Sequence, residues 1–295
     1  MTYLGLIRGA TGIQYFIRRP PNGAPVSPSL WSECRRLALE IQELSPALLS
    51  TAQAPAVQSS DPAVCAAAWS HAGAVIVLAA NTENRPVPVQ LRLGEPFSGE
   101  ADVLFASRRL PVAKGVITDT IDGFGTRAYQ IAVGPEPEPR ASLSAGNLTV
   151  NPSFEESTNA GSPDGCYVME GKDPGASLLV DPRLAVHGRH SLRVCTPTAR
   201  GGLRIVPFPI AVKAGTHYRL SIWARGLQTG RKFRFGLAAL GCGEKEFLAS
   251  REWAEYSLVG VAKADNARAN IGLELLSQGT CWFDLMQMVE VAGPS

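Results

Sequence analysis

Two carboxylates that lie far apart in the sequence could together hold a metal ion. Glu155 follows the segment 147–154, and Asp284 stands just before the predicted closing strand, 285–291. The first and last strands of an antiparallel sandwich often lie side by side, so the two acids could share one site. Calcium binds carboxylate and carbonyl oxygens, and the turn 187–191 could supply the carbonyls. The alternative is that each acid caps a turn at the surface.

Trp223 is a candidate platform for a sugar ring. Apolar and polar residues alternate along 218–225, and Trp223 has the parity of the polar ones, which is typical of a strand with one wet face. An aromatic ring can stack on a pyranose while neighbouring polar side chains bind its hydroxyls. The side chains proposed for this role are Arg225, Glu274, Asn270 and Arg234, with Tyr167 from the loop 160–176. The alternative is that Trp223 packs under a loop such as 164–176.

Composition indicates a folded protein and excludes several partner classes. A chain of 295 residues suggests two or three domains. Its hydrophobic content of 45% and charged content of 18% are ordinary for a globular protein. A net charge of +2 gives no reason to expect nucleic acid or an anionic membrane as partner. The sequence contains no apolar run long enough to span a bilayer and no signal-peptide pattern at its start.

The first predicted unit, residues 1–50, combines one strand with helices. The apolar run 12–17, bounded by Gly and Arg-Arg-Pro-Pro, predicts a buried strand, and 3–8 predicts the end of a helix before it. A second helix begins near Ser27-Pro28. Its predicted apolar face consists of Trp31, Cys34, Leu37, Ala38, Ile41, Leu44 and Leu48. Its predicted polar face consists of Arg35, Arg36, Glu40 and Glu43. We expect this unit to pack partly on the β-rich unit that follows and to leave some apolar surface exposed.

Two β-rich units follow, each after a linker. The linker 51–63 leads to the unit 64–133, and the Pro- and Glu-containing linker 134–146 leads to the unit 147–291. Strands in the unit 64–133 are predicted at 65–70, 74–81, 87–93, 101–105, 110–112, 115–120 and 126–133. Many short strands at regular spacing predict a small antiparallel sandwich.

Five segments of the last unit carry a resemblance to a known family. They are NPSFEE at 151–156, HGRHSLRV at 187–194, YRLSIWAR at 218–225, WAEY at 253–256 and FD at 283–284. Their order and spacing resemble carbohydrate-binding modules of the family four and nine type, which are jelly-roll β-sandwiches with a galactose-binding-like fold. The resemblance implies a polysaccharide or oligosaccharide as partner and a structural calcium at Glu155 and Asp284. The family often has two adjacent acids near the last strand, where this sequence has Leu285 in the second position.

The rest of the chain resembles parts of glycoside hydrolases. Residues 1–50 look like the last strand and helix of the (β/α)8 barrel of the β-galactosidase-like clan, and 64–133 look like the all-β domain after such barrels. The predicted fold is therefore mainly β: an accessory sandwich and a jelly roll, preceded by one β/α unit left from a TIM barrel. The resemblance implies the non-catalytic C-terminal segment of a secreted or periplasmic hydrolase, with the missing barrel as partner. The alternative is a structural or interaction jelly roll that binds no sugar and packs on that barrel.

No catalytic set is visible in the sequence. Hydrolysis of a glycosidic bond needs two carboxylates at a fixed separation. The predicted strand 12–17 is not followed by an acid until Glu33, which falls inside the predicted helix. The four histidines are scattered, and no glycine-rich phosphate loop follows a strand.

Overall fold

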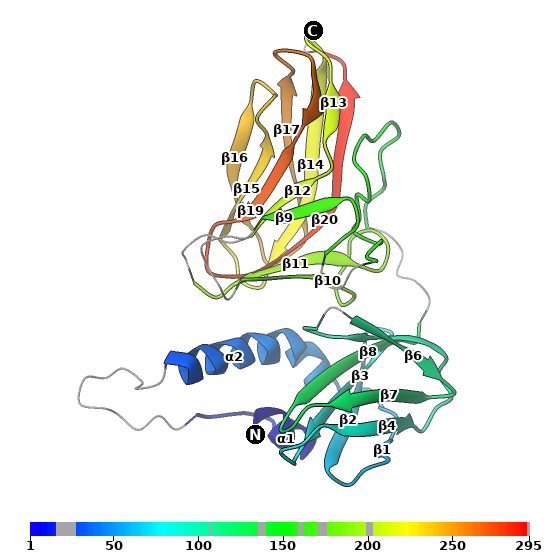
Figure 1. Ribbon diagram of the computed structural model, residues 1–295. Helices are drawn as coiled ribbons and strands as arrows, with labels where there is room; N and C mark the ends of the chain where they lie inside the picture. Colours follow the sequence, from blue (N-terminus) through cyan, green and yellow to red (C-terminus); the bar gives the residue numbers. More distant parts are fainter. Residues whose placement is uncertain are drawn as a thin grey trace, which may run out of the picture. The chain divides into compact units, whose positions relative to one another are not determined.

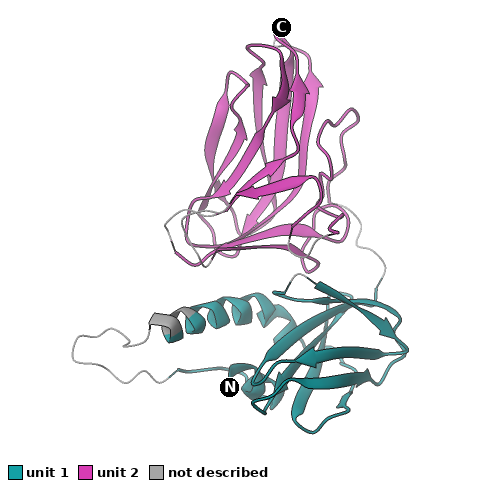
Figure 2. Ribbon diagram, viewed as in Figure 1, with its two compact units in different colours: residues 1–135 teal, residues 136–295 magenta. Residues whose placement is uncertain are grey.

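The chain forms two compact units, Met1–Pro135 and Glu136–Ser295 (Figure 2). The computed structural model describes residues 1–15, 28–106, 108–134, 140–158, 162–169, 176–198 and 203–293. Among the helices in these residues, none is long and apolar enough to cross a membrane.

The described residues of unit 1 form two helices and eight strands (Figure 1). The helices are α1 (Thr2–Ile7) and α2 (Pro28–Leu48), and the strands are β1 (Val57–Ser59), β2 (Val64–His71), β3 (Ala74–Asn81), β4 (Val87–Leu93), β5 (Gly99–Val103), β6 (Arg108–Ala113), β7 (Val116–Ile121) and β8 (Thr126–Ala132). All seven predicted strands are present. The predicted linker 51–63 contains an additional strand, β1, which pairs with β4.

The strands of unit 1 form one antiparallel sheet in the order β1-β4-β7-β6-β5-β8-β3-β2. Its two edge strands, β1 and β2, also contact each other, so the sheet curves round on itself. In β4, the sequence VPVQLRL alternates strictly between buried and exposed side chains. Val77, Leu91, Ile117 and Tyr129 are among the fully buried residues inside the curved sheet. The predicted two-layer sandwich is therefore a single rolled sheet.

Both helices cover one outer face of this sheet (Figure 1). Tyr3, Leu6 and Leu44 from the helices pack with Ile76 and Leu78 from β3. Strand β3 is consequently covered on both faces, which explains why its sequence AVIVLAAN is almost continuously apolar. The predicted packing of the N-terminal segment on the β-rich unit is confirmed.

Two residues of α2 differ from the predicted faces. Ala38 is exposed, whereas Glu40 is buried. Glu40 is held there because the hydroxyl of Tyr3 donates a hydrogen bond of 3.0 Å to its carboxylate and Arg36 forms an ion pair with it. Buried carboxylates are stable only when paired in this way. Trp31 lies outside the residues whose side chains are described.

The predicted strand 12–17 is wrong in its described part. Residues 12–15 have no regular structure, and Ile13 and Tyr15 are 36% and 40% exposed. A buried parallel strand needs neighbours on both sides, and the described strands of unit 1 are all antiparallel partners of one another. Residues 16–17 lie outside the described residues. The described part of the chain therefore contains no β/α unit of a TIM barrel.

Unit 2 contains twelve strands. They are β9 (Cys166–Met169), β10 (Ser177–Asp181), β11 (Ser191–Thr196), β12 (Arg204–Pro207), β13 (Ile210–Val212), β14 (His217–Gly226), β15 (Arg231–Leu237), β16 (Gly243–Ala249), β17 (Ala254–Val261), β18 (Asn266–Ala269), β19 (Ile271–Leu275) and β20 (Gly279–Val291). Five of them form the β14 sheet, in the order β10-β11-β20-β14-β17. Five others form the β15 sheet, in the order β16-β15-β19-β12-β9, and β13 pairs with β18.

The two sheets pack face to face, so unit 2 is the predicted antiparallel β-sandwich (Figure 1). Ile222 of β14 and Phe283 of β20 enter the core from one sheet, and Phe233 and Leu273 enter it from the other. The rings of Phe233 and Phe283 lie 5.3 Å apart between their centroids. Side chains of the opposite parity point outwards from each sheet.

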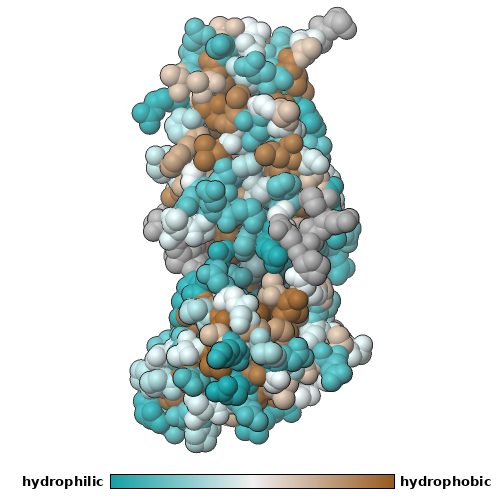
Figure 3. Space-filling view, turned by 90° about the vertical axis from the view of Figure 1, so that its right-hand side faces the viewer, coloured by the Kyte–Doolittle hydropathy of each residue, from teal (hydrophilic) through white to brown (hydrophobic). Residues whose placement is uncertain are grey.

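The outer surface is mixed in polarity. On the face shown in Figure 3, hydrophobic areas are interrupted by hydrophilic side chains. Within residues 1–50, Leu30 and Leu49 are nevertheless 63% and 69% exposed. The predicted exposure of apolar residues in the N-terminal unit is thus confirmed.

Candidate functional site

The structure divides the predicted sugar-binding residues between two opposite surfaces. Trp223 and Arg225 lie on β14, whose core-facing residues are of the other parity. Arg234 on β15 and Glu274 on β19 likewise point outwards, but from the β15 sheet. Because the two sheets face each other across the core, their outer faces lie on opposite sides of the sandwich. Alternation along 218–225 predicts that Trp223 and Arg225 point outwards, but it does not show which sheet a strand joins.

The face that carries Trp223 is largely packed. Trp223 is half-buried, and its cross-strand neighbours are Glu255 on β17 and Asp284 on β20. Trp282 on the same face is 2% exposed and donates a hydrogen bond of 2.9 Å from Nε1 to Asp181. This face therefore offers little open aromatic surface.

The outer face of the β15 sheet carries a row of alternating charges. Cross-strand neighbours on consecutive strands are Glu246 on β16, Arg234 on β15, Glu274 on β19, Arg204 on β12 and Met169 on β9. Arg234 lies 3.1 Å from Glu246 and 3.6 Å from Glu274, and Arg204 lies 4.0 Å from Glu274. We call this arrangement the charged row. It contains two of the predicted residues and crosses all five strands.

Two glycines beside the charged row bring an ion pair close to the backbone. Gly236 and Gly272 are cross-strand partners on β15 and β19. A Cβ atom at Gly272 would lie 2.6 Å from Cζ of Arg204 and 2.7 Å from a carboxylate oxygen of Glu244. The pair formed by Arg204 and Glu244 therefore lies over the glycines. Glycine inside a strand is the signal in the sequence that could have identified this close approach.

Exposed aromatic rings stand at one end of the charged row. Tyr167 is 55% exposed, and its ring centroid lies 5.1 Å from that of Phe208, which is 43% exposed. The sequence predicts a loop at Tyr167, but this residue belongs to strand β9. Phe208 was not predicted. Asn270 is exposed immediately before β19 and is not a member of the row.

The acidic and basic side chains of the charged row are stabilised in their ionised forms. Hydrogen bonds from Arg234 and Lys232 lower the pKa of the Glu246 carboxyl. The hydrogen bond to Glu244 raises the pKa of the Arg204 guanidinium. The side chains remain between 20% and 45% exposed, so a ligand can reach them.

Glu155 and Asp284 lie close together, as predicted, but they bind backbone N–H groups. Oε1 of Glu155 accepts hydrogen bonds from the amides of Arg189 and His190, at 3.0 and 2.8 Å. Oδ2 of Asp284 accepts from the amides of Val186 and His187, at 2.6 and 3.0 Å. The turn therefore presents donors, and not the predicted carbonyl acceptors, to both carboxylates.

These bonds leave little capacity for calcium. A carboxylate oxygen that accepts two amide N–H groups has used both of its lone pairs. Only Oε2 of Glu155 and Oδ1 of Asp284 are then left to bind a metal. Each of these two oxygens already accepts one hydrogen bond. Calcium takes six to eight oxygens. The described residues contain no group of three or more His, Cys, Asp or Glu side chains that could hold a metal. A calcium ion stays a prediction, which thermal unfolding with calcium and with a chelator would test.

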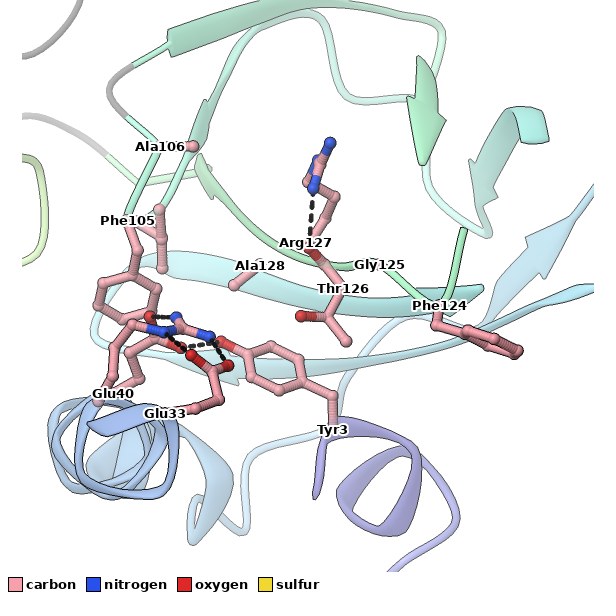
Figure 4. A pocket seen from close by; sticks show the side chains of 12 residues that line it. Tyr3, Glu33, Glu40, Phe105, Ala106, Phe124, Gly125, Thr126, Arg127 and Ala128 are labelled. Atoms are coloured by element: carbon pink, nitrogen blue, oxygen red, sulfur yellow. Dashed lines mark hydrogen bonds and ion pairs between the residues drawn. The ribbon is translucent and has the colours of Figure 1, made fainter. Parts of the chain in front are cut away.

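Unit 1 contains a cavity of about 350 Å³ between its helices and the rolled sheet (Figure 4). Figure 4 shows Tyr3, Glu33 and Glu40 directed towards one another at its wall. Arg36 binds both carboxylates, and its Nε donates to Glu33 at 2.9 Å. That hydrogen bond lowers the pKa of Glu33, which is the reverse of what a general acid requires. The cavity wall is therefore an ion-pair network.

Comparison with known proteins identifies similar structures but no family. No family model and no curated protein matches the sequence. TmCBM61 in complex with β-1,4-galactotriose is 17% identical, with a TM-score of 0.39 over 50% of this chain and 100% of that one. The xylan-binding domain CBM22-1 of Xyn10C from Paenibacillus barcinonensis is 16% identical, with a TM-score of 0.36 over 52% of this chain and 100% of that one.

A third similar structure is the N-terminal cellulose-binding domain of the β-1,4-glucanase C of Cellulomonas fimi. It is 16% identical, with a TM-score of 0.34 over 52% of this chain and 100% of that one. These three structures are carbohydrate-binding modules, but the enzymatically active domain of bacteriophage CBA120 tailspike protein 4 is similar too, at 15% identity and a TM-score of 0.39 over 49% of this chain and 21% of that one. At these TM-scores the likeness identifies no ligand for this chain, so its function is derived below from its own residues.

Proposed function

We propose that unit 2 binds a carbohydrate through the outer face of the β15 sheet. The observation that carries this proposal is the exposed pair Tyr167 and Phe208 at the end of the charged row. A sugar ring presents C–H groups on its faces and hydroxyls at its edges. The aromatic pair can pack on the faces, while arginines donate to the hydroxyls and glutamates accept from them. Few other ligands need both surfaces side by side.

The charge balance of this face favours a neutral sugar. Among the described residues of this face, three acids are matched by three bases in ion pairs, so these side chains carry no excess charge to attract an ionic ligand. The acids are Glu244, Glu246 and Glu274, and the bases are Arg204, Lys232 and Arg234. Their mutual pairing also fixes the side chains before a ligand arrives, which lowers the entropy cost of binding.

The test compares the full-length protein with its Tyr167→Ala variant on neutral oligosaccharides, namely β-1,4-galactotriose, xylohexaose and cellohexaose. We expect the affinity for the preferred sugar to fall about ten-fold or more, equivalent to ~1.4 kcal/mol. Because Tyr167 is exposed, thermal unfolding should change little. The measurement is isothermal titration calorimetry with unfolding of the same samples.

Val259→Ala provides the matched control. Val259 is also an exposed apolar residue on a strand, at 55%, but it lies in β17 of the other sheet. Its truncation should leave sugar affinity unchanged. Equal loss in both variants, or absence of binding to every sugar of the panel, would contradict the proposal and favour the alternative of a structural or interaction sandwich.

We further propose that unit 2 serves a glycoside hydrolase outside the cytoplasm. This part rests only on the resemblance of residues 64–133 to the all-β domain that follows hydrolase barrels, since the described part of residues 1–50 contains no β/α barrel unit. DNA sequence adjoining the coding region would support this proposal if it encodes barrel strands in the same reading frame.

A further inference from the structure

Two arginines of unit 2 lie near a third, Arg225, which packs beside Trp282. Arg225 lies on β14, Arg251 on the connection between β16 and β17, and Arg140 on the segment before the first strand of unit 2. Among the described residues, none of these three side chains has a hydrogen bond or ion pair. By contrast, Arg204, Arg219 and Arg234 of the same unit each form an ion pair with a glutamate.

Backbone contacts bring the three arginines together. The amide of Gly226 donates to the carbonyl of Ser250 at 2.7 Å, which places Arg251 beside the end of β14. The amide of Arg140 donates to the carbonyl of Val186 at 2.7 Å. The amide of Val186 in turn donates to Asp284, which is the cross-strand neighbour of Trp223 on β14. Both neighbouring segments are therefore held against the outer face of the β14 sheet.

The surroundings of Arg225 contain two further guanidinium groups and one carboxylate. Burial lowers the pKa of the Arg225 guanidinium most. The carboxylate of Glu252 raises that pKa, while the charges of Arg140 and Arg251 lower it, neither by more than Glu252 raises it. Three guanidinium groups thus share one neighbouring carboxylate. Like charges held together in this way are unfavourable unless an anion joins them.

Arg225 has unused donors at a buried position. Its Nε is buried without a hydrogen-bond partner, and its Cζ lies 5.9 Å from the centre of the Trp282 ring. Arg127 and Arg231 also have an Nε without a hydrogen bond, but other nitrogens of their guanidinium groups are hydrogen-bonded, and Nε of Arg127 lies 3.7 Å from Asp119. Buried donors are nearly always satisfied in folded proteins. An acceptor from outside the chain would satisfy this one.

We propose that Arg225, Arg140 and Arg251 form a binding site for an oxyanion, meaning a carboxylate, sulfate or phosphate group. The guanidinium fork matches such oxygens in charge and in geometry. The site lies on the β14 sheet, so it is separate from the neutral-sugar face and does not depend on it. Trp223, two residues from Arg225 on the same face, is half-buried, and the exposed part of its side chain adds a small apolar surface next to the charged group, as an acidic sugar would need.

The experiment measures thermal unfolding and calorimetric binding of the full-length protein in sodium sulfate, sodium phosphate and sodium glucuronate. Sodium chloride at equal ionic strength corrects for screening, and glucose is the neutral counterpart of glucuronate. We expect all three oxyanions to raise the unfolding temperature above the chloride reference. Glucuronate binding at least ten-fold tighter than sulfate would assign the site to acidic sugars, and equal binding would assign it to free inorganic oxyanions.

The variant Arg140→Gln/Arg251→Gln tests the residues, since both side chains are exposed and their loss should not prevent folding. We expect it to bind the preferred oxyanion at least ten-fold more weakly. Arg219→Gln is the control, because Arg219 lies on the same strand and face but is paired with Glu255. Absence of any effect beyond chloride, or equal affinity in the double variant, would overturn the site. Tyr167→Ala should bind oxyanions normally, so this proposal and the neutral-sugar proposal fail independently.

Discussion

Glu155 and Asp284 show how two carboxylates can organise a turn. Together they accept backbone N–H groups from four residues of the segment 186–190. Nδ1 of His190 also lies 2.9 Å from Oε2 of Glu155. A turn whose amides point inwards needs such acceptors, because buried N–H groups without partners are costly. Both residues therefore hold the turn against the last strand, with or without a metal.

Asp284 should make stability depend on pH. Burial outweighs the N–H donors and raises its pKa to about 7, well above that of an unfolded aspartate. The folded state therefore binds the proton more tightly, so the stability that Asp284 contributes is complete below about pH 4 and is lost as pH rises towards 7. Denaturant unfolding of the wild type and of Asp284→Asn should show the wild type losing about 3 kcal/mol relative to the variant between pH 4 and 8. A constant difference, or one of opposite sign, would contradict this.

Turns between elements place several residues in the left-handed region. In unit 2, Asn151, Phe154 and Leu285 have φ values of 47°, 56° and 46° around the turn bound by Glu155 and Asp284. Non-glycine residues adopt this conformation only where surrounding contacts enforce it. Leu285 stands where a second acid was expected, and it is fully buried. The segment is thus shaped by packing as well as by the carboxylates.

Gly188 lies in the turn 186–190, and Gly146, which lies outside it, is the matched control position. Both have φ of +73°, but a Cβ at Gly188 would lie 2.6 Å from the carboxyl carbon of Glu155, while one at Gly146 meets nothing within 4 Å. Gly146→Ala should cost only the conformational strain, about 1 kcal/mol. Gly188→Ala should cost about 2–4 kcal/mol, because Glu155 must also move away from the amides it accepts. Chemical denaturation measures the loss of unfolding free energy in both variants. Equal losses would show that the Glu155 side chain moves aside at no further cost, which would contradict this prediction.

Each unit has a hydrophobic core of its own. The core of unit 2 contains only residues between Phe154 and Met288. Unit 1 has a core inside its rolled sheet and a second one under its helices. Separate cores are what independently folding domains require.

We expect the full-length protein to unfold in two transitions, one for each unit. Leu91 is fully buried in the rolled sheet and Phe233 is fully buried in the sandwich. Leu91→Ala should cost about 2–5 kcal/mol and lower only the transition of unit 1. Phe233→Ala should cost about 3–5 kcal/mol and lower only that of unit 2. Calorimetry of both variants measures this, and a single transition shifted by either substitution would show that the units unfold together.

Local patterns in the sequence determined the strands and their faces. Alternation placed the strands of unit 1 within about two residues and showed correctly that Trp223 and Arg225 point away from a core. The spacing of apolar residues also predicted α2. These features depend on interactions between residues close in sequence, or on the periodicity of one element, so a single sequence contains them.

Only the tertiary structure decided which strands are neighbours. It assigned Trp223 and Glu274 to different sheets, added Phe208 to Tyr167, and turned amides of the segment 186–190, not carbonyls, towards Glu155. It also left residues 12–15 exposed, because the described strands of unit 1 form a closed set of antiparallel pairs. Pairing between strands distant in sequence follows from the packing of the whole core, and periodicity within one strand contains no information about its partner.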